Sequence, residues 1–401
     1  MNSDTSKPVR LGSTSRKLLN RLDSGSNDST KNWVKLQETE RKRRALLKRT
    51  DESSYRILFS YEGTFWIILV RSALLWITVA VYILVRLLAS CNLWSLPPLE
   101  ASQVDILAIH VGIVCTLITF FLVYFHLQYS NRFDQLYMQC VACQGRIFDL
   151  SLFAKTTLPL KRATRLIRYL NAAHIVAYAG VSPQVYSIDD VFSHLNVKWQ
   201  LLTPKELAQL RDIGMVEGSA MYREALTWCM LEVHDAHKCG LIGEHISVLF
   251  HEKILAFRGA FATIYDLDDQ PILFFYIHFI HFLSAVYLPL LAFFVANQVT
   301  SYGHWTGNVI GLVVVVLEGI FVIGIRVFAQ MMQRPFGGKL ENLSVLTYLT
   351  FVYEASMRTL KSEMWAPLDV DLENQLANGR ESLGKPWEED YEPCRSRTSI
   401  S

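Results

Sequence analysis

Two short stretches of the sequence carry side chains that could ligate a metal ion. The stretch "CVAC" places Cys140 and Cys143 in a Cys-x-x-Cys spacing, and "HDAHKC" contributes His234, His237 and Cys239. Thiolates and imidazoles are the ligands of tetrahedral zinc sites, so the two stretches would form such a site if the fold brought them together. Both stretches have a helical pattern, in which cysteine and histidine also pack as ordinary buried residues. We therefore favour buried packing and expect no metal or other cofactor.

Motifs for catalysis are missing from the sequence. It contains no Gly-x-Ser-x-Gly elbow, no phosphate-binding loop and no His-Glu-x-x-His. We therefore predict no catalytic residues and do not expect an enzyme. A metal-dependent membrane enzyme built on the cysteines and histidines above is the weakest alternative, and it would require stoichiometric zinc in the purified protein.

A third pattern is an aromatic stripe. Thr116, Phe120 and Tyr124 are spaced four residues apart and so share one face of a helix. One interpretation is a buried stripe that packs on a neighbouring helix, which is the commoner case. The other is a narrow apolar constriction, which gates by dewetting in an oligomeric pore. Periodicity alone does not choose between them.

The composition indicates where these residues are placed. Of 401 residues, 51% are apolar and only 19% are charged, a balance unusual for a soluble globular protein. Each of four segments has roughly 20 or more mostly apolar residues, enough to cross a hydrocarbon core as a helix. We predict transmembrane helices within Leu58–Ala89, Val104–Leu127, Pro271–Ala296 and Asn308–Met332.

Lysine and arginine predict the orientation, because they are retained on the cytoplasmic side. The segment before the first span contains "ERKRRALLKR" (Glu40–Arg49), whereas the connections 90–103 and 297–307 have neither residue. Both termini and the middle region should therefore face the cytoplasm or an equivalent compartment. A reducing compartment disfavours disulfides among the seven cysteines.

Ionisable side chains inside the spans are costly and usually face protein or water. Glu318 is the most central of them, and we expect it either to pair with an arginine across helices or to line a water-filled cavity. The full set is Arg71, Arg86, His110, His126, His278, His281, Glu318 and Arg326.

The chain divides by composition into six parts. The middle region has helical periodicity, and Thr203-Pro204-Lys205-Glu206 predicts a helix start with a capping box. The first thirty or so residues are rich in Ser, Asp and Asn, which predicts disorder; a targeting peptide is the alternative. The predicted parts are 1–54 (basic N-terminal region), 55–127 (first two spans), 128–270 (cytoplasmic helices), 271–332 (last two spans), 333–365 (post-membrane turn and helix) and 366–401 (tail).

Several stretches, in this order and spacing, resemble motifs of the bestrophin family of anion channels. The resemblance runs from about Tyr55 to Leu360, and in it Arg132 takes the family's arginine position after the second span. The stretches are "SYEGTFWIIL", "NRFDQLYMQ", "RLIRYLNAAHIVAYAGVSPQVY", "IYDLDDQPILFFYIH" and "RPFGG".

The resemblance implies an all-α homopentamer in which the second span lines a central pore above a cytoplasmic helical vestibule. Counted back from Arg132, the family's three neck positions fall on Thr116, Phe120 and Tyr124. The stretch "CGLIGEHIS" places Ile246 at the cytoplasmic aperture, with His245 and Gly243 as alternatives. Arg132 would raise the local anion concentration at the basic end of the pore helix, or serve as a structural partner for Asp134, Asp149 or Glu232.

In the family, the turn after the fourth span continues into a calcium clasp of carboxylates and backbone oxygens. Here Arg334 stands at the asparagine position, Gly338 at the first acidic position, and Lys339 where oxygen ligands are needed. We therefore expect this turn to be structural and not to gate the channel through calcium. The degenerate clasp comprises Arg334, Pro335, Phe336, Gly337, Lys339 and Glu341.

The implied function is a channel for chloride and related monovalent anions, with bicarbonate among the candidates. A non-conducting membrane scaffold or regulatory subunit with the same fold is the alternative. The implied partners are anions, the lipid bilayer and further copies of the chain, and not nucleic acid. Plasma membrane, endomembrane and plastid membrane all remain open as its location.

Overall fold

The structure is a computed structural model that describes residues 33–46, 65–91, 101–213, 219–270, 274–299 and 305–362. By its internal contacts the chain forms two units, Met1–Leu360 and Lys361–Ser401. Of the second unit the structure describes only Lys361 and Ser362. The predicted disordered or targeting N-terminus, the tail from 366 onward and most of the two connections outside the predicted cytoplasmic face lie outside the described residues.

Every regular element in the described ranges is helical, in agreement with the predicted fold class. Residues 33–46 form an N-terminal helical segment. The helices that follow are α3 (Phe65–Arg71), α4 (Ala73–Ser90), α5 (Ala101–Thr157), α6 (Leu160–Val181), the π-helical turn η1 (Ile188–Phe192), α7 (Ser193–Trp199), α8 (Pro204–Asp212), α9 (Ser219–Lys238), α10 (Glu244–Asp269), α11 (Phe274–Val299), α12 (Trp305–Met332) and α13 (Val345–Lys361).

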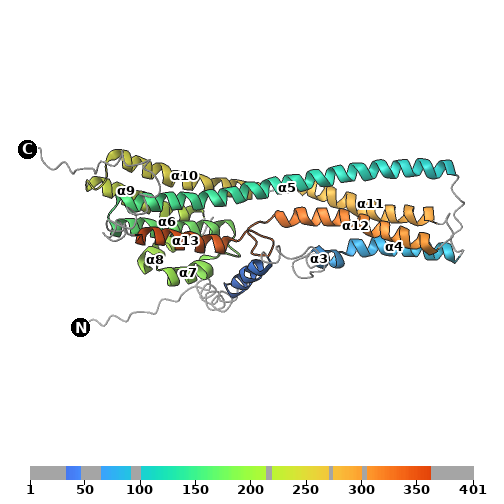
Figure 1. Ribbon diagram of the computed structural model, residues 1–401, viewed down its shortest axis with the longest axis horizontal. Helices are drawn as coiled ribbons and strands as arrows, with labels where there is room; N and C mark the ends of the chain where they lie inside the picture. The colour runs from blue at the N-terminus through green and yellow to red at the C-terminus, as the bar shows by residue number, and fades with distance from the viewer. Residues whose placement is uncertain are drawn as a thin grey trace, which may run out of the picture. The chain divides into compact units, whose positions relative to one another are not determined.

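Helix α5 connects the two packed regions of the first unit. It is 57 residues long, and Figure 1 shows it beside α11 and α12 over one part of its length and beside α10 over another. The prediction ended the second span at Leu127, but the helix continues to Thr157. Beyond Leu127 the apolar residues that pack are confined to one face of the helix, on which Leu136, Cys140 and Ile147 are buried. The sequence therefore continues as an amphipathic helix.

The four predicted spans correspond to four helices that are long and apolar enough to cross a bilayer. Candidate spans cover Ala73–Ser90, His110–Thr157, Phe274–Gln298 and Trp305–Met332. The first predicted segment, Leu58–Ala89, is not one helix: Ser72 has extended backbone between α3 and α4, and residues 58–64 lie outside the described residues. Arg71 and Ser72 interrupt the apolar run at this break, but two such residues do not by themselves predict the end of a helix.

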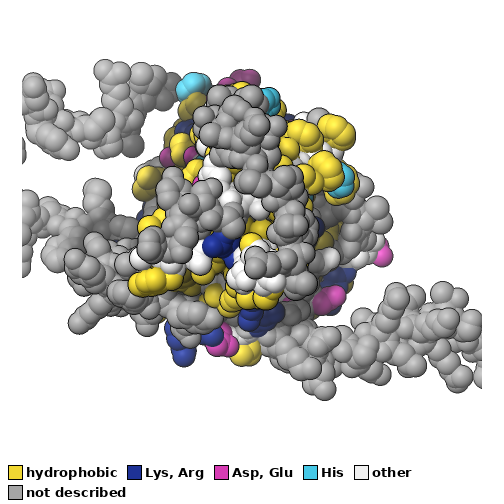
Figure 2. All heavy atoms as spheres, turned by 90° about the vertical axis from the view of Figure 1, so that its right-hand side faces the viewer, with side chains coloured by type: hydrophobic (Ala, Val, Ile, Leu, Met, Phe, Trp, Pro, Cys, Tyr) yellow, Lys and Arg dark blue, Asp and Glu magenta, His cyan; other side chains and the backbone are white. Residues whose placement is uncertain are grey.

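The spans pack through a cluster that we call the span core, to which α3, α4, α5, α11 and α12 all contribute. It contains Leu69, Leu75, Ile118, Leu122, Phe125, Tyr129, Ile280, Tyr287, Leu288, Leu291, Val322, Ile323 and Ala329. Many other large apolar side chains of these helices are exposed, and Figure 2 shows hydrophobic side chains on one face of the described residues. Exposed apolar side chains are expected where a helix meets lipid or another subunit.

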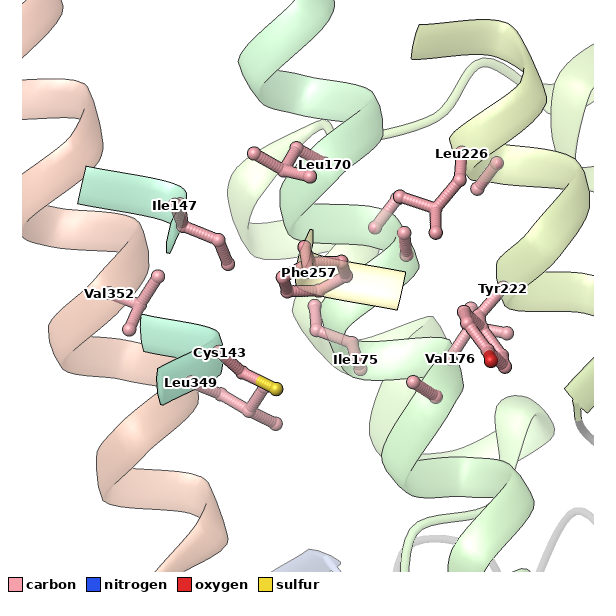
Figure 3. Close-up of a cluster of buried hydrophobic side chains, with 14 of the residues drawn as sticks. Cys143, Ile147, Leu170, Ile175, Val176, Tyr222, Leu226, Phe257, Leu349 and Val352 are labelled. Carbon is pink, nitrogen blue, oxygen red and sulfur yellow. The ribbon is translucent and has the colours of Figure 1, made fainter. Parts of the chain in front are cut away.

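A second cluster, the helix-bundle core, joins the later half of α5 to α6, α9, α10 and α13. Figure 3 shows Ile147, Leu170, Leu226, Phe257 and Val352 converging from these five helices. His174 lies fully buried in this cluster, with its ring beside those of Tyr178, Phe257 and Phe261. Burial lowers the pKa of His174 to about 3, so this side chain is neutral at physiological pH.

The predicted helix start at Thr203 is confirmed. The Thr203 hydroxyl accepts from the Glu206 amide at 3.4 Å, and the Glu206 carboxylate accepts from the Thr203 amide at 2.7 Å, which completes a capping box with Pro204 at the first helical position. The same carboxylate accepts from Tyr169 at 2.6 Å and from Arg168 at 3.2 Å. The cap therefore also attaches α8 to α6.

Candidate functional site

The aromatic stripe lies on the face of α5 that points away from the span core. Phe120 is 63% exposed and Tyr124 47% exposed, whereas Leu122 and Phe125 on the opposite face are buried. Thr116 is also exposed, and its hydroxyl donates to the Gly112 carbonyl oxygen at 2.9 Å. Within one chain the stripe is therefore not the packing face of its helix.

Aromatic contacts between α5 and α11 hold the stripe in its orientation. The ring of Tyr124 meets Tyr276 edge to face at 6.1 Å, and the ring of Phe121 meets Phe279 in the same way at 5.7 Å. The Tyr276 hydroxyl also donates to the Phe121 carbonyl oxygen at 3.2 Å. Such aromatic pairs stabilise helix packing by more than their buried area alone accounts for. They therefore fix the rotation of α5, and so the direction of the stripe, relative to α11.

Glu318 lies behind the stripe rather than on it. Its carboxylate oxygen accepts a hydrogen bond from the Tyr287 hydroxyl at 3.3 Å and a weaker one from the Cys115 thiol at 3.4 Å. Of the two expected arrangements, the arginine pair is not found among the described residues, and the carboxylate is half-buried between α5, α11 and α12. Arg86, one of the expected partners, donates instead to the Ala296 carbonyl oxygen at 3.2 Å.

Arg132 does not pair with the acids considered for it. Its Nη2 atom donates to the backbone carbonyl oxygen of Leu267 near the end of α10. Asp149 pairs instead with Lys253 at 2.9 Å, and Glu232 is shared by two arginines of α6. Arg132 therefore connects α5 to the end of α10 through a backbone oxygen.

The aperture candidates lie at the start of α10. Ile246 is half-buried and packs against the helix-bundle core, while His245 is exposed and Gly243 is the N-cap residue. The exposed large apolar side chains nearby are Leu241 (45%) and Val248 (48%). Periodicity did not point to these two, because the register of the helix start decides which positions are exposed.

The turn after α12 is stabilised by hydrogen bonds among its own residues and by the close approach of Gly338 to Val185. The Leu343 amide donates to the Pro335 carbonyl oxygen at 2.8 Å, and the side-chain amide of Asn342 donates to the Arg334 carbonyl oxygen. Gly338 has a φ of +68°, and a Cβ there would lie 2.8 Å from a methyl carbon of Val185. A residue with a side chain would be strained at this position on both counts.

An ion pair from the N-terminal helical segment occupies this turn. Arg43 donates to the carbonyl oxygen of Leu340 at 3.0 Å, to that of Lys339, and to the Glu40 carboxylate at 2.5 Å. Glu40 in turn accepts from the Ser344 hydroxyl at 2.5 Å. Both charged side chains are buried, with Glu40 5% and Arg43 9% exposed. We call this pair and its turn contacts the Arg43 latch.

The contacts of the Arg43 latch show whether this turn could bind a calcium ion. A calcium ion needs six to eight oxygen ligands, mostly carboxylate and carbonyl. Here the carbonyl oxygens of Lys339 and Leu340 already accept from a guanidinium, and the Asn342 amide nitrogen faces the Arg334 carbonyl. The residues present therefore do not fit a calcium ion at this turn.

The sequence analysis missed the latch, since Glu40 and Arg43 were considered only as part of a basic run that orients the first span. The spacing of the two residues, three apart on a helix, is the only local signal for the ion pair. Nothing local could reveal its partners, which lie about 300 positions later in the chain.

The cysteines and histidines of the two metal-like stretches have separate surroundings. Cys140 and Cys143 are buried in the helix-bundle core. The His237 ring contacts the Ile242 carbonyl oxygen at 3.1 Å, and the Cys239 thiol lies 3.6 Å from the Arg162 guanidinium. Within the described ranges, no group of three or more His, Cys, Asp or Glu side chains could hold a metal ion.

Comparison with solved structures shows the fold. A bacterial bestrophin homologue from Klebsiella pneumoniae has a TM-score of 0.60 at 13% sequence identity, over 73% of this chain and 98% of that chain. A single-substitution variant of that homologue has a TM-score of 0.61 at 13% identity, over 75% and 100% of the two chains. A second variant has a TM-score of 0.59 at 14% identity, again over 75% and 100%.

Comparison with protein-family models shows the family. Residues 45–358 match the family described as "Bestrophin, RFP-TM, chloride channel". No protein of curated function matches the chain. The matched residues include all four candidate spans, the turn after α12 and the helix-bundle core except Leu36 and Leu360. The chain is thus a multi-pass membrane protein and not an enzyme, and it belongs to the bestrophin family of chloride channels.

Proposed function

We propose that five copies of this chain form an anion-selective channel in which the α5 helices surround one central pore. The observation that carries the proposal is the stripe on α5, which is exposed in a single chain although it is aromatic. A row of exposed aromatic side chains on a membrane helix requires lipid, another subunit or a pore beside it. Its position on the pore helix of the resembled family favours the pore.

The neck of this channel would consist of Thr116, Phe120 and Tyr124 from each subunit. Eight residues separate its ends, so it would extend for about 12 Å along the helix axis. The edge of an aromatic ring is its positive part, and ring edges facing the axis favour an anion over a cation. Thr116 makes one end of the neck more polar than a purely apolar constriction, which eases wetting there.

The two termini and the helix-bundle core would face the cytoplasm or an equivalent compartment. The basic run before the first span supports this orientation, because lysine and arginine near membrane ends are retained inside. Ile246, His245 and the exposed Leu241 and Val248 would then lie at the aperture that leads to the pore. Chloride is the proposed ion, and bicarbonate is a second candidate.

The proposed channel does not require calcium at the turn after α12, because the Arg43 latch already supplies a positive charge to the carbonyl oxygens there. The experiment measures the reversal potential of purified protein in a planar bilayer under a potassium chloride gradient with calcium chelated. A potential near the chloride equilibrium value supports an anion pore that is independent of calcium. A bilayer that stays silent after calcium is added would favour a non-conducting scaffold.

The neck is tested in the same bilayers with Phe120→Ala. Removing the ring should change conductance or anion preference, since it widens the narrowest part of the proposed pore. Phe282→Ala is the matched control, because Phe282 is 59% exposed on α11 but lies off the stripe. Equal currents from the wild type and both variants would contradict the placement of the neck.

A further inference from the structure

A cavity lies where the apolar spans give way to the helix-bundle region. Its volume is about 900 Å³. Its walls come from α3, α5, the segment after α6, the end of α10, the end of α12 and the turn that follows α12. Ile67 and Met331 are among its lining residues, and Met331 lies at the end of the candidate span Trp305–Met332, where a hydrocarbon core would end.

The cavity wall carries an excess of positive charge. Four cationic side chains line it, and they are Arg71, Arg132, Arg334 and Lys339. Among the described residues, two acidic side chains also line it, Asp268 and Glu341. Among the described residues, none of the four cations makes an ion pair within 4 Å of a carboxylate. Within the described part of the wall, positive charges therefore outnumber negative charges by two.

Arg132 is the fixed member of this group. The bond from its Nη2 atom to Leu267 fixes the guanidinium, while its Nε and Nη1 atoms are buried without a hydrogen-bond partner among the described residues. Because these two atoms are closed to solvent, what Arg132 contributes to the cavity wall is a positive charge fixed in place. Burial raises the pKa of the neighbouring Asp268, although Arg132 and Arg334 act to lower it.

We propose that this cavity binds a phosphate group, presented either by an anionic lipid of the adjacent leaflet or by free phosphate. Arginine binds phosphate oxygens through paired N–H donors, and the three arginines of this wall belong to three separate elements. Basic pockets beside membrane helices on the cytoplasmic side are suited to lipid headgroups. The bound phosphate would connect α3, α5 and the turn after α12. This inference does not depend on conduction by the proposed pore.

The test uses detergent-solubilised full-length protein and follows its thermal unfolding. The probes are short-chain phosphatidylglycerol, short-chain phosphatidylcholine as the neutral lipid, and inorganic phosphate. Saturable stabilisation by phosphatidylglycerol alone supports the lipid as the source, and stabilisation by inorganic phosphate as well supports a free-phosphate site. Equal stabilisation by phosphatidylcholine, or none by any probe, overturns the proposal.

Variants locate the binding. Arg71→Gln combined with Lys339→Gln removes two exposed cations from the cavity wall. We expect the probe that stabilises the wild type to bind the double variant at least about tenfold more weakly, because charge-assisted hydrogen bonds are lost. The matched control, Lys161→Gln with Lys198→Gln, makes the same change of net charge on exposed residues away from the cavity. Equal weakening in both pairs would show general attraction to a basic protein and overturn the site. Arg334→Gln, also exposed, provides an independent single variant if the double one folds poorly.

Discussion

The Arg43 latch gives the most quantitative prediction. Replacing Arg43 by methionine keeps much of the apolar volume but removes the donors to two backbone carbonyl oxygens and to Glu40. It leaves a carboxylate that is only 5% exposed without its counter-ion. Breaking a buried ion pair in this way costs about 3–5 kcal/mol, since the remaining charge stays desolvated.

This cost can be read as a change of unfolding temperature. An unfolding entropy of about 2.1 cal/mol/K per residue gives about 0.8 kcal/mol/K for a chain of this length. We therefore expect Arg43→Met to lower the unfolding temperature in detergent by about 4–6 °C. Limited chymotrypsin digestion should also cut the N-terminal helical segment faster, because the latch attaches that segment to the turn.

Arg44→Met is the matched control, since Arg44 is the next residue of the same segment and is exposed. It should shift the unfolding temperature by less than about 1 °C, as surface substitutions usually do. The double variant Glu40→Gln with Arg43→Met should be less destabilised than the sum of its single variants, because it leaves no buried charge. Equal shifts in Arg43→Met and Arg44→Met would refute the reasoning.

Three further perturbations test other parts of the fold. His174 is neutral in the folded protein down to a pKa of about 3, whereas in the unfolded chain its pKa is about 6.5. Between these two values only the unfolded chain takes up the proton, so the free energy of unfolding should fall as the pH drops from about 6.5 toward about 3, by up to about 1.4 kcal/mol per pH unit. His174→Phe should flatten this dependence in pH-dependent melts, whereas the exposed His245→Gln should leave it unchanged. Gly338→Ala should cost roughly 1–3 kcal/mol in thermal unfolding, while Gly145→Ala, whose new methyl group meets open space within a helix, should cost nothing. Thr203→Ala should cost about 1 kcal/mol by loss of the cap of α8, and Thr203→Ser should restore most of it; an unchanged melt in Thr203→Ala would contradict the role of the cap.

Local patterns were enough to predict the spans and the caps. Long apolar runs located all four candidate spans, because the bilayer fixes the length that a spanning helix needs. The ends of the last two agree to within three residues, whereas the first starts at Ala73 rather than Leu58 and the second continues to Thr157 rather than Leu127. The capping box at Thr203 was readable because its hydrogen bonds join residues three apart. The start of the third span was predicted at Pro271, but residues 271–273 lie outside the described residues.

Interactions between distant parts of the chain could not be read in this way. The break at Ser72 follows Arg71 in an otherwise apolar run, and this sequence is compatible with one helix or two. The distant partners of Arg43, and the partners of Arg132 and Glu318, are backbone oxygens or uncharged donors in other elements, which no charge pattern marks. The predicted neck, aperture and oligomer remain predictions, since they concern contacts between copies of the chain.

Because α5 is one continuous helix, it sets the rotation of the span core relative to the helix-bundle core about the axis of α5. The helix has 57 residues and no proline, so its hydrogen-bond ladder is not interrupted between the stripe and Thr157. One residue inserted between Arg132 and Cys140 would turn the stripe by about 100° relative to the helix-bundle core, whereas seven would restore its direction to within about 20°. The helical phase of this short segment therefore selects which side chains of α5 face the proposed pore.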